Sequence, residues 1–257
     1  MEPTGERTVP GIDREQYFFA RHDAVYRWVC SEFTTDLAAA RVLDAGSGEG
    51  YGAELLAESG PSAVIGLEYD DHACRHAAGT YPRTHVVRAN LAHLPVRDHS
   101  LDMVITLQVI EHLWDLSGFL TDLLRAVRPG GLLVASTPNR HTFSPGLGRG
   151  ERPINPFHVE EFDAEQVNNL LVAAGWHDVR VLGLHHGRRI TEWEARHGSI
   201  MAAQVTAALA DDWPDDLIGF TASITAADFT IASETASDAG SAQDLIAVGR
   251  APEPLSA

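Results

Sequence analysis

The chain has 257 residues, with 36 acidic and 19 basic side chains that give a formal net charge of −17. This balance argues against nucleic acid as a substrate or partner, because phosphate backbones are bound by clustered cations. Cys30 and Cys74 lie far apart without metal-ligand spacing, which is typical of free thiols in a reducing compartment. The first 16 residues are polar and no segment approaches the length of a membrane span, so we expect a cytoplasmic protein without membrane attachment.

The first half of the chain predicts a helix followed by alternating strands and helices. Residues 1–40 are expected to form an irregular arm and one helix, from Tyr17 to Phe33, whose apolar residues recur at helical spacing. In residues 41–137, Pro129-Gly130-Gly131 is expected to end a helix that begins near Leu116. Strands are predicted at Arg41–Ala45, Ala63–Glu68, Thr84–Ala89, Asp102–Leu107 and Leu132–Thr137. Strands separated by helices predict a doubly wound α/β domain with a mainly parallel sheet.

Residues 138–227 break this alternation and are expected to form the substrate side of the domain. Residues 138–156 are rich in proline, glycine and arginine and too long for an ordinary connection, so we predict an active-site loop. Asp163 and Gln166 resemble a capping box and predict a helix that runs to about Ala174.

The last part of the chain predicts further strands around a helical insertion. Val179–Leu184 is predicted as a strand and residues 185–227 as a partly helical insertion. Within residues 228–257 we predict strands at Phe229–Ser233 and Asp244–Arg250, separated by a flexible turn of serine, glycine and alanine. We therefore expect a single domain over residues 1–257.

A glycine-rich turn between the first strand and the next helix is the most informative feature of the sequence. Residues 42–52 read VLDAGSGEGYG, in which four glycines alternate with other residues. Such a strand, tight turn and helix N-terminus form the nucleotide-binding corner of doubly wound domains. Glu68 ends the second strand twenty positions after Gly48, where a carboxylate can accept hydrogen bonds from both ribose hydroxyls. Because Tyr51 stands at the third glycine of the dinucleotide motif, the pattern departs from that of nicotinamide and flavin enzymes.

Five motifs, taken in order, resemble those of the class I S-adenosylmethionine-dependent methyltransferases. They read VLDAGSGEGYGAELLA, VIGLEYD, RANLAHLPVRDHSLDMV, LQVIEHLWD and RAVRPGGLLVASTPNR. The resemblance covers nearly the whole chain. It implies a Rossmann-like, seven-stranded sheet with a helical insertion, and S-adenosylmethionine as the cofactor.

The resemblance also implies the cofactor-binding residues. Asp44, Gly46 and Gly48 would surround the methionine part of the cofactor, Glu68 would bind the ribose, and Tyr69 would lie beside the adenine. The same resemblance gives further positions: Ser47, Leu91 and Gln108 in the motifs, Asn90 where the family often has an aspartate, and Arg21 and His22 over the cofactor's carboxylate. The side-chain carbonyl of Asn90 can still accept a hydrogen bond from the adenine amino group. For Arg21 and His22, a solvated helix face is the alternative.

Two histidines are candidates for catalysis. A hydroxyl acceptor must lose a proton during methylation, and a histidine within hydrogen-bond reach is the usual base. His112 follows the fourth strand at the carboxyl edge of the sheet, where ligands bind in such folds. It can be the base, or it can orient the neighbouring Glu111. His158 can act there or attach the loop to the domain. Adjacent residues on a loop are poor evidence for metal-ligand geometry, so we expect no metal.

A narrower resemblance concerns the methyl acceptor. GERTVPGID, YFFARHDAVYRWV, STPNRHTFSPG and NPFHVEEF resemble an actinobacterial group that includes the mycofactocin oligosaccharide methyltransferases. This resemblance implies an O-methyltransferase for a sugar hydroxyl, and Trp114, Trp193 and Trp213 could stack on the sugar or pack in the core. The alternatives are O- or C-methylation of a quinone, polyketide or similar small metabolite, and a cofactor-binding protein without turnover.

Overall fold

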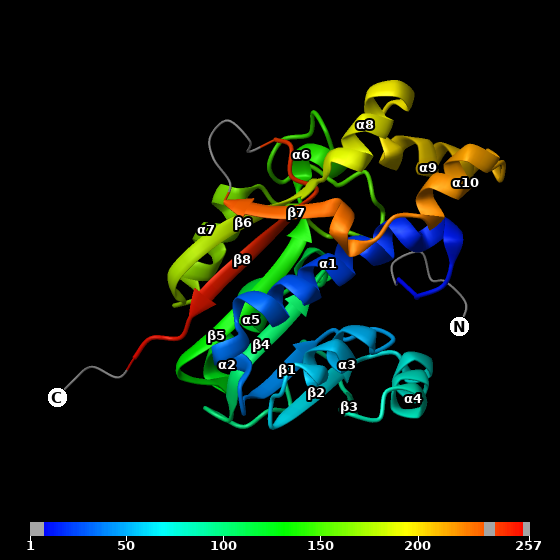
Figure 1. Ribbon diagram of the computed structural model, residues 1–257. Coiled ribbons are helices and arrows are strands. Elements are labelled where there is room, and N and C mark those ends of the chain that lie inside the picture. Colours follow the sequence, from blue (N-terminus) through cyan, green and yellow to red (C-terminus); the bar gives the residue numbers. More distant parts are fainter. Residues whose placement is uncertain (1–7, 234–239, 254–257) are drawn as a thin grey trace.

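The structure is a computed structural model that describes residues 8–233 and 240–253. The described residues form one eight-stranded sheet in the order β3-β2-β1-β4-β5-β8-β6-β7 (Figure 1). The strands are β1 (Arg41–Ala45), β2 (Ala63–Glu68), β3 (Thr84–Arg88), β4 (Leu101–Leu107), β5 (Val127–Pro138), β6 (His177–His186), β7 (Phe229–Ser233) and β8 (Asp244–Arg250). Strands β1 to β5 are parallel, whereas β8 pairs antiparallel with both β5 and β6, and β7 pairs antiparallel with β6.

Ten α-helices and three short 3₁₀ helices are found in the described ranges. The α-helices are α1 (Gln16–Glu32), α2 (Thr34–Leu37), α3 (Tyr51–Glu58), α4 (Asp71–Thr80), α5 (Leu116–Ala126), α6 (Arg140–Phe143), α7 (Ala164–Ala173), α8 (Arg188–His197), α9 (Ile200–Ala210) and α10 (Asp215–Ala222). The 3₁₀ helices are η1 (Asp13–Glu15), η2 (Ile110–His112) and η3 (Ala226–Asp228). Among these residues, no helix is both long and apolar enough to cross a membrane.

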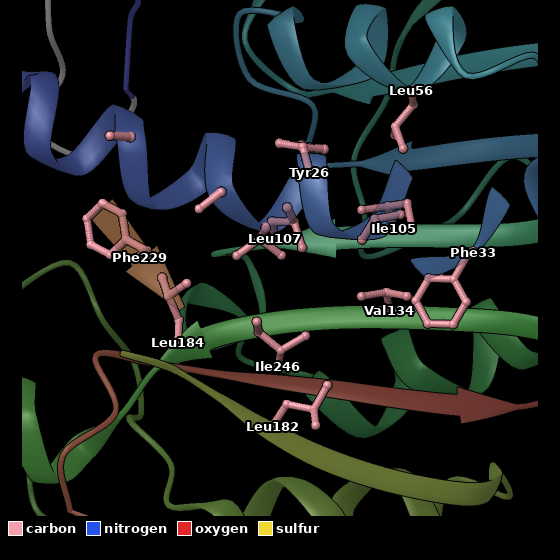
Figure 2. Packing of buried hydrophobic residues seen from close by; sticks show 14 of the residues in the cluster. Tyr26, Phe33, Leu56, Ile105, Leu107, Val134, Leu182, Leu184, Phe229 and Ile246 are labelled. Atoms are coloured by element: carbon pink, nitrogen blue, oxygen red, sulfur yellow. The ribbon is translucent and has the colours of Figure 1, made fainter. Parts of the chain in front are cut away.

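The core lies on both faces of the sheet, because successive strand residues point to opposite faces. On one face, α1 and α3 pack on alternate residues of the central strands, such as Ile105 and Val134. Figure 2 shows this layer, in which Tyr26 of α1 and Leu56 of α3 lie over Ile105. On the other face, α5 and α7 cover the intervening residues, such as Val104. Burial on both faces explains why these strands read as continuous apolar runs.

The sheet contains one strand more than the seven that the family resemblance implies. All eight strand segments predicted along the sequence form, including Phe229–Ser233, which is β7 at the outer edge of β6. Phe229, the first residue of β7, is buried with its ring centroid 5.8 Å from that of Tyr17 in α1. This burial stabilises β7 in its place at the edge of the sheet. The flexible turn predicted before β8 lies largely outside the described residues.

The predicted boundary between α5 and β5 is wrong by several residues. The helix ends at Ala126, and the extended strand already includes Pro129-Gly130-Gly131. The residue before a proline is disfavoured in the helical conformation, so Arg128 adopts an extended one and the helix ends before it. Glycine and proline therefore bend the start of a strand here rather than separating it from the helix.

The insertion lies beyond the carboxyl ends of the parallel strands. Figure 1 shows α8, α9 and α10 gathered there, beside the start of α1. The side chain of Gln16 donates a hydrogen bond to the carbonyl of Ile224, 2.9 Å away, and Trp193 stacks on Phe220 with ring centroids 5.1 Å apart. The insertion and the N-terminal helix thus form one wall above the edge of the sheet where ligands bind.

Candidate active site

The glycine-rich turn lies at the end of β1, where the lack of side chains leaves main-chain atoms accessible. Gly46, Gly48 and Gly50 all have positive φ, at 86°, 56° and 101°. A Cβ atom at Gly46 would collide with Cγ2 of Val109, so this position requires glycine for space as well as for conformation. The turn is anchored because the amides of Gly46 and Ser47 donate to the carbonyl of Leu67 at 2.8 and 3.1 Å.

Glu68 is held at the end of β2 with its carboxylate beside this turn. Its Oε2 accepts a hydrogen bond from the amide of Gly48 at 3.0 Å, and its Oε1 accepts from the amides of Tyr69 and Asp70 at 2.9 and 2.8 Å. Main-chain donors fix the orientation of the carboxylate before a ligand arrives. Glu68 also lines the cavity described next, which places its carboxylate beside a ligand bound there.

A cavity of about 380 Å³ lies between the turn and the end of β4. Eight of the predicted cofactor or catalytic residues line it: His22, Gly46, Ser47, Gly48, Glu68, Leu91, Gln108 and His112. Oγ of Ser47 is buried and has no hydrogen-bond partner among the described residues. A polar atom of this kind, the open backbone of the turn and the Glu68 carboxylate fit an adenosyl ligand with a ribose and an amino-acid tail.

Four predicted cofactor residues lie outside the lining of this cavity: Asp44, Tyr69, Asn90 and, on α1, Arg21. Asp44 is completely buried below the turn and accepts hydrogen bonds from Tyr26 Oη, at 3.1 Å to each carboxylate oxygen. Burial raises the pKa of Asp44 to about 7, although the Tyr26 hydrogen bonds oppose this shift. Tyr69 is 67% exposed, and the Asn90 side-chain carbonyl accepts the amide of Ala92 at 2.9 Å.

Arg21 and His22 separate into different environments on α1. Arg21 is buried and forms an ion pair with Asp244 of β8, so its charge is already balanced within the protein. His22 borders the cavity and its Nδ1 lies 3.2 Å from Oγ1 of Thr8. Burial lowers the pKa of His22 to about 3, so its imidazole is neutral at physiological pH. It can offer a hydrogen bond to a ligand but no positive charge.

Gln108 stands at the junction between this cavity and a second one. It has a positive φ of 55°, an uncommon backbone conformation for a residue other than glycine. Its Nε2 donates to Oγ of Ser136 and to Oδ1 of Asp244, both at 3.2 Å. Gln108 therefore links the end of β4 to β5 and β8. Through Asp244 it also contacts the Arg21–Asp244 ion pair, whose arginine lines the second cavity.

The second cavity has a volume of about 570 Å³ and lies under the insertion. Both cavities include Thr8, His22, Gln108 and His112 in their linings, so they adjoin each other. The second one is largely apolar, with the side chains of Phe18, Phe143 and Trp213 in its wall. Two of its lining residues also carry buried acceptor oxygens without a partner in the described part of the chain, Glu15 Oε2 and Gln204 Oε1.

Three polar side chains meet where the second cavity approaches the first. Glu111 and His112 belong to η2, which follows β4, and His158 comes from the segment before α7. The rings of His112 and His158 have centroids 5.0 Å apart, and Nε2 of His112 lies 3.9 Å from Oε1 of Glu111. Burial raises the pKa of Glu111 to about 8, while a hydrogen bond from Oγ1 of Thr137, at 3.1 Å, opposes the shift.

The two histidines of this group are each oriented through Nδ1. His112 Nδ1 lies 3.0 Å from the carbonyl oxygen of Phe157, which can only accept, so this nitrogen carries the hydrogen. His158 Nδ1 lies 2.7 Å from Oε1 of Glu161, and its Nε2 lies 3.0 Å from Nδ2 of Asn155. Both rings therefore present the lone pair of Nε2.

Several residues in or next to the two cavities carry no recognisable sequence signal. Tyr26 donates a hydrogen bond to Asp44. In the sequence, nothing distinguishes it from the other residues on the apolar face of α1. Gln204 and Glu15 lie in the insertion and the N-terminal arm, where no motif marks them. Of the three tryptophans proposed for sugar stacking, Trp213 lines the second cavity, Trp193 is in the core and Trp114 is 91% exposed.

Comparison with known proteins identifies the family. A family model described as a methyltransferase domain matches residues 43–135. A probable S-adenosylmethionine-dependent methyltransferase of Mycobacterium tuberculosis is 46% identical over 252 residues, which covers 97% of this chain and 89% of that protein. A probable S-adenosylmethionine-dependent methyltransferase of Mycolicibacterium smegmatis is 43% identical over 251 residues, with coverage of 97% and 95%. A ubiquinone biosynthesis O-methyltransferase of Sinorhizobium fredii is 33% identical over 122 residues, 44% of this chain and 49% of that protein.

Solved structures share the fold at low sequence identity. A methyltransferase dependent on S-adenosylmethionine from Archaeoglobus fulgidus aligns with a TM-score of 0.61 and 19% identity, covering 92% of this chain and 97% of that one. The relatives similar over nearly the full length are named methyltransferases, which favours an enzyme over a binding protein without turnover. The chain therefore belongs to the S-adenosylmethionine-dependent methyltransferases: it is an enzyme, and S-adenosylmethionine is its cofactor.

Proposed function

We propose that this enzyme is an O-methyltransferase that methylates a sugar hydroxyl of a glycosylated metabolite such as the mycofactocin oligosaccharide. The observation that carries the proposal is the second cavity, which combines an aromatic wall with the buried, unpartnered oxygens of Glu15 and Gln204. A sugar has apolar C–H faces that pack on aromatic rings, and hydroxyls that donate hydrogen bonds. A buried acceptor without a donor costs free energy, so a hydroxyl-bearing ligand would stabilise both groups.

Cofactor binding is proposed to use the first cavity. Gly46, Ser47 and Gly48 would surround the methionine part, Glu68 would accept the ribose hydroxyls, and Leu91 would contact the adenine. A second group would act less directly or from the rim: Asp44 below the turn, Tyr69 and Asn90 near the adenine end, and Arg21, His22 and Gln108 near the junction. For the residues that line the first cavity, these roles are supported by that position and, at Glu68, by the hydrogen bonds that orient its carboxylate.

The junction of the two cavities is the proposed place of methyl transfer. Bound S-adenosylmethionine supplies a methyl group that its sulfonium sulfur already activates. The protein must align the acceptor oxygen with that methyl group and accept the proton of the hydroxyl. His112 lines both cavities and presents the Nε2 lone pair, so we place it next to the acceptor oxygen. His158 lies behind it and lines only the second cavity.

A second candidate acceptor is a phenolic or enolic hydroxyl of a quinone or polyketide. The apolar wall of the second cavity suits a planar aromatic acceptor as well as a sugar. The partial similarity to a ubiquinone biosynthesis O-methyltransferase also favours it. The two candidates differ in their need for Glu15 and Gln204, because a simple phenol carries too few hydroxyls to reach both.

The acceptor class can be tested with S-adenosylmethionine that carries a deuterated methyl group. We expect the enzyme to label hydroxyls in glycosylated extracts, and we expect Gln204→Leu to weaken this reaction while a phenol panel stays unlabelled. Mass spectrometry with fragmentation would locate the label. Labelling of phenols alone would favour the second candidate, and label on carbon or nitrogen would contradict O-methylation.

His112→Ala tests the placement of the acceptor. We expect kcat to fall by about 100-fold or more with little change in KM, because the side chain acts on the reacting hydroxyl rather than on the rest of the acceptor. His141→Ala is the matched control. His141 belongs to α6, which follows β5, and it lines neither cavity. Equal rates for the His112 variant and the native enzyme would remove His112 from the site.

A further inference from the structure

The group formed by Glu111, His112 and His158 has the composition and spacing of a metal site. One possible ligand atom of each residue lies within 4.8 Å of those of the other two. Glu111 and His158 are buried, and all three residues line the second cavity. We propose that this group binds one divalent transition-metal cation through the Glu111 carboxylate and Nε2 of both histidines.

The hydrogen bonds behind the two histidines match those of metal ligands. A ligating histidine commonly donates its other ring N–H to a carboxylate or a main-chain carbonyl, which fixes the ring and the tautomer. His158 has the carboxylate of Glu161 at 2.7 Å from Nδ1, and His112 has the carbonyl of Phe157 at 3.0 Å. Two histidines from separate segments are thus both oriented so that Nε2 can bind the same cation.

A hydrogen bond from a neighbouring residue also orients the Glu111 carboxylate. Its Oε2 accepts a hydrogen bond from Oγ1 of Thr137 at 3.1 Å, and its Oε1 is the oxygen nearest to Nε2 of His112. The amide Nδ2 of Asn155 lies 3.0 Å from Nε2 of His158, which marks that nitrogen as an acceptor. A cation would take the place of this amide donor.

The charge of the surroundings also favours a cation. Glu111 and Glu161 are both buried, at 1% and 2% exposure, and within residues 8–233 and 240–253 neither forms an ion pair with an arginine. The buried guanidinium nearby, Arg21, forms its ion pair with Asp244. Buried carboxylates need a compensating charge, and a dication between Glu111 and the imidazoles supplies it.

The ligand set indicates the class of metal. Two neutral imidazoles and one carboxylate suit Zn²⁺, Mn²⁺, Fe²⁺ or Co²⁺ better than Ca²⁺ or Mg²⁺, which prefer oxygen ligands throughout. Three protein ligands leave coordination positions open, as in catalytic sites. These positions would face the second cavity, where the acceptor binds in the proposed function.

The cation would activate the acceptor hydroxyl, and this role rests on the proposed function, whereas metal binding itself does not. A metal-bound hydroxyl has a lowered pKa and releases its proton to water. Its oxygen then forms the new bond to the methyl carbon as the bond from that carbon to sulfur breaks. With the cation bound, Nε2 of His112 would be a metal ligand rather than the base. The hydroxyl would then lose its proton because the cation lowers its pKa.

Cation binding can be measured on the full chain after treatment with a chelator. We expect calorimetric titration with Zn²⁺ or Mn²⁺ to give one site per chain, and Co²⁺ to give a visible absorption band from nitrogen ligation. His158→Ala should weaken binding by at least about 100-fold, and Glu161→Gln, which keeps the shape of the side chain, by about 10- to 100-fold. His141→Ala serves as the control and should bind like the native chain.

The outcomes separate this inference from the proposed function. No stoichiometric site on the native chain, or equal affinity in His158→Ala, would overturn the metal site. If the chelated enzyme then still methylated hydroxyls at the full rate, His112 alone would be the base and the proposed function would stand. Stoichiometric binding lost in His158→Ala, without labelled hydroxyl product from any acceptor, would support the metal site and contradict the proposed function.

Discussion

Glu68 is oriented by the amides of Gly48, Tyr69 and Asp70, so its carboxylate and the glycine turn form one unit. Glu68→Ala removes the proposed acceptor for the ribose hydroxyls and an anchor of the turn. We expect the affinity for S-adenosylmethionine to fall by about 10- to 100-fold, since hydrogen bonds to a charged group contribute about 1.5–3 kcal/mol each. Isothermal titration calorimetry would measure this. Glu68→Gln should lose less, and unchanged affinity in Glu68→Ala would contradict the ribose role.

Asp44 gives a pH dependence whose sign follows from its burial. Its pKa of about 7 in the folded state lies above the value of about 3.9 in an unfolded chain, so the folded protein holds this proton more tightly. The stabilisation is complete below the unfolded pKa and is lost as the pH rises towards 7.

The variant Asp44→Asn isolates this effect, because it keeps an acceptor for Tyr26 and cannot ionise. The native free energy of unfolding should fall relative to that of the variant between pH 4 and 7, by about 1.4 kcal/mol for each unit of pKa difference. Denaturant unfolding at several pH values would measure it. A difference that stays constant over this range would show that the pKa of Asp44 is not raised.

At this scale, the sequence predicted several residues that line the first cavity and missed the residues that support them. Gly46, Gly48 and Glu68 line this cavity, and they could be found because glycine spacing and a strand-end carboxylate are local patterns. Their roles in cofactor binding stay predictions. The part played by Tyr26 and the partner of Arg21 depend on contacts over 18 and 223 residues of sequence, which no local pattern records.

Among the elements, α7 and the long loop before it depend on one carboxylate. Asp163 caps α7 by accepting the amide of Gln166 at 2.9 Å, and it also binds Arg140 and Arg149 of the loop at 2.6 and 2.8 Å. The capping box was predicted from the sequence, and the structure confirms it. The arginines extend its role, because they fasten residues 140–149 to the start of the helix.

Asp163→Ala should therefore destabilise more than the loss of a cap alone. Removing one partner of a buried ion pair typically costs about 3–5 kcal/mol, because Arg140 is left buried without its carboxylate. Thermal unfolding would show a clearly lower Tm. Glu165→Ala is the control, since this exposed partner of Arg149 should contribute less than about 1 kcal/mol. Similar Tm values for the two variants would contradict the anchoring role.

The elements also show where sequence patterns stop being informative. Strand positions were predicted well because buried parallel strands are continuous apolar runs. The start of β5 was misplaced because proline and glycine can interrupt a helix or bend a strand, and only pairing with β4 decides between them. The segment of β7 was predicted from the sequence, but its place at the edge of the sheet follows from its pairing with β6.

For the whole molecule, the essential arrangement is two adjoining cavities at the carboxyl edge of one sheet. The first lies mainly between the ends of β1, β2 and β4. The second is lined by the N-terminal arm with α1, the residues after β4, the segment after β5 and the insertion. The motifs predicted the first cavity. They could not predict the second, because its walls come from four separate segments that only the fold brings together.

A crystal structure of the enzyme with S-adenosylhomocysteine tests the central claim most directly. We predict the ribose hydroxyls within hydrogen-bond distance of Glu68, the amino-acid part on the turn at Gly46 to Gly48, and the sulfur at the junction beside Gln108 and His112. With this placement the methyl group of the cofactor would face the second cavity. A ligand bound elsewhere, or a sulfur directed away from the junction, would contradict the account.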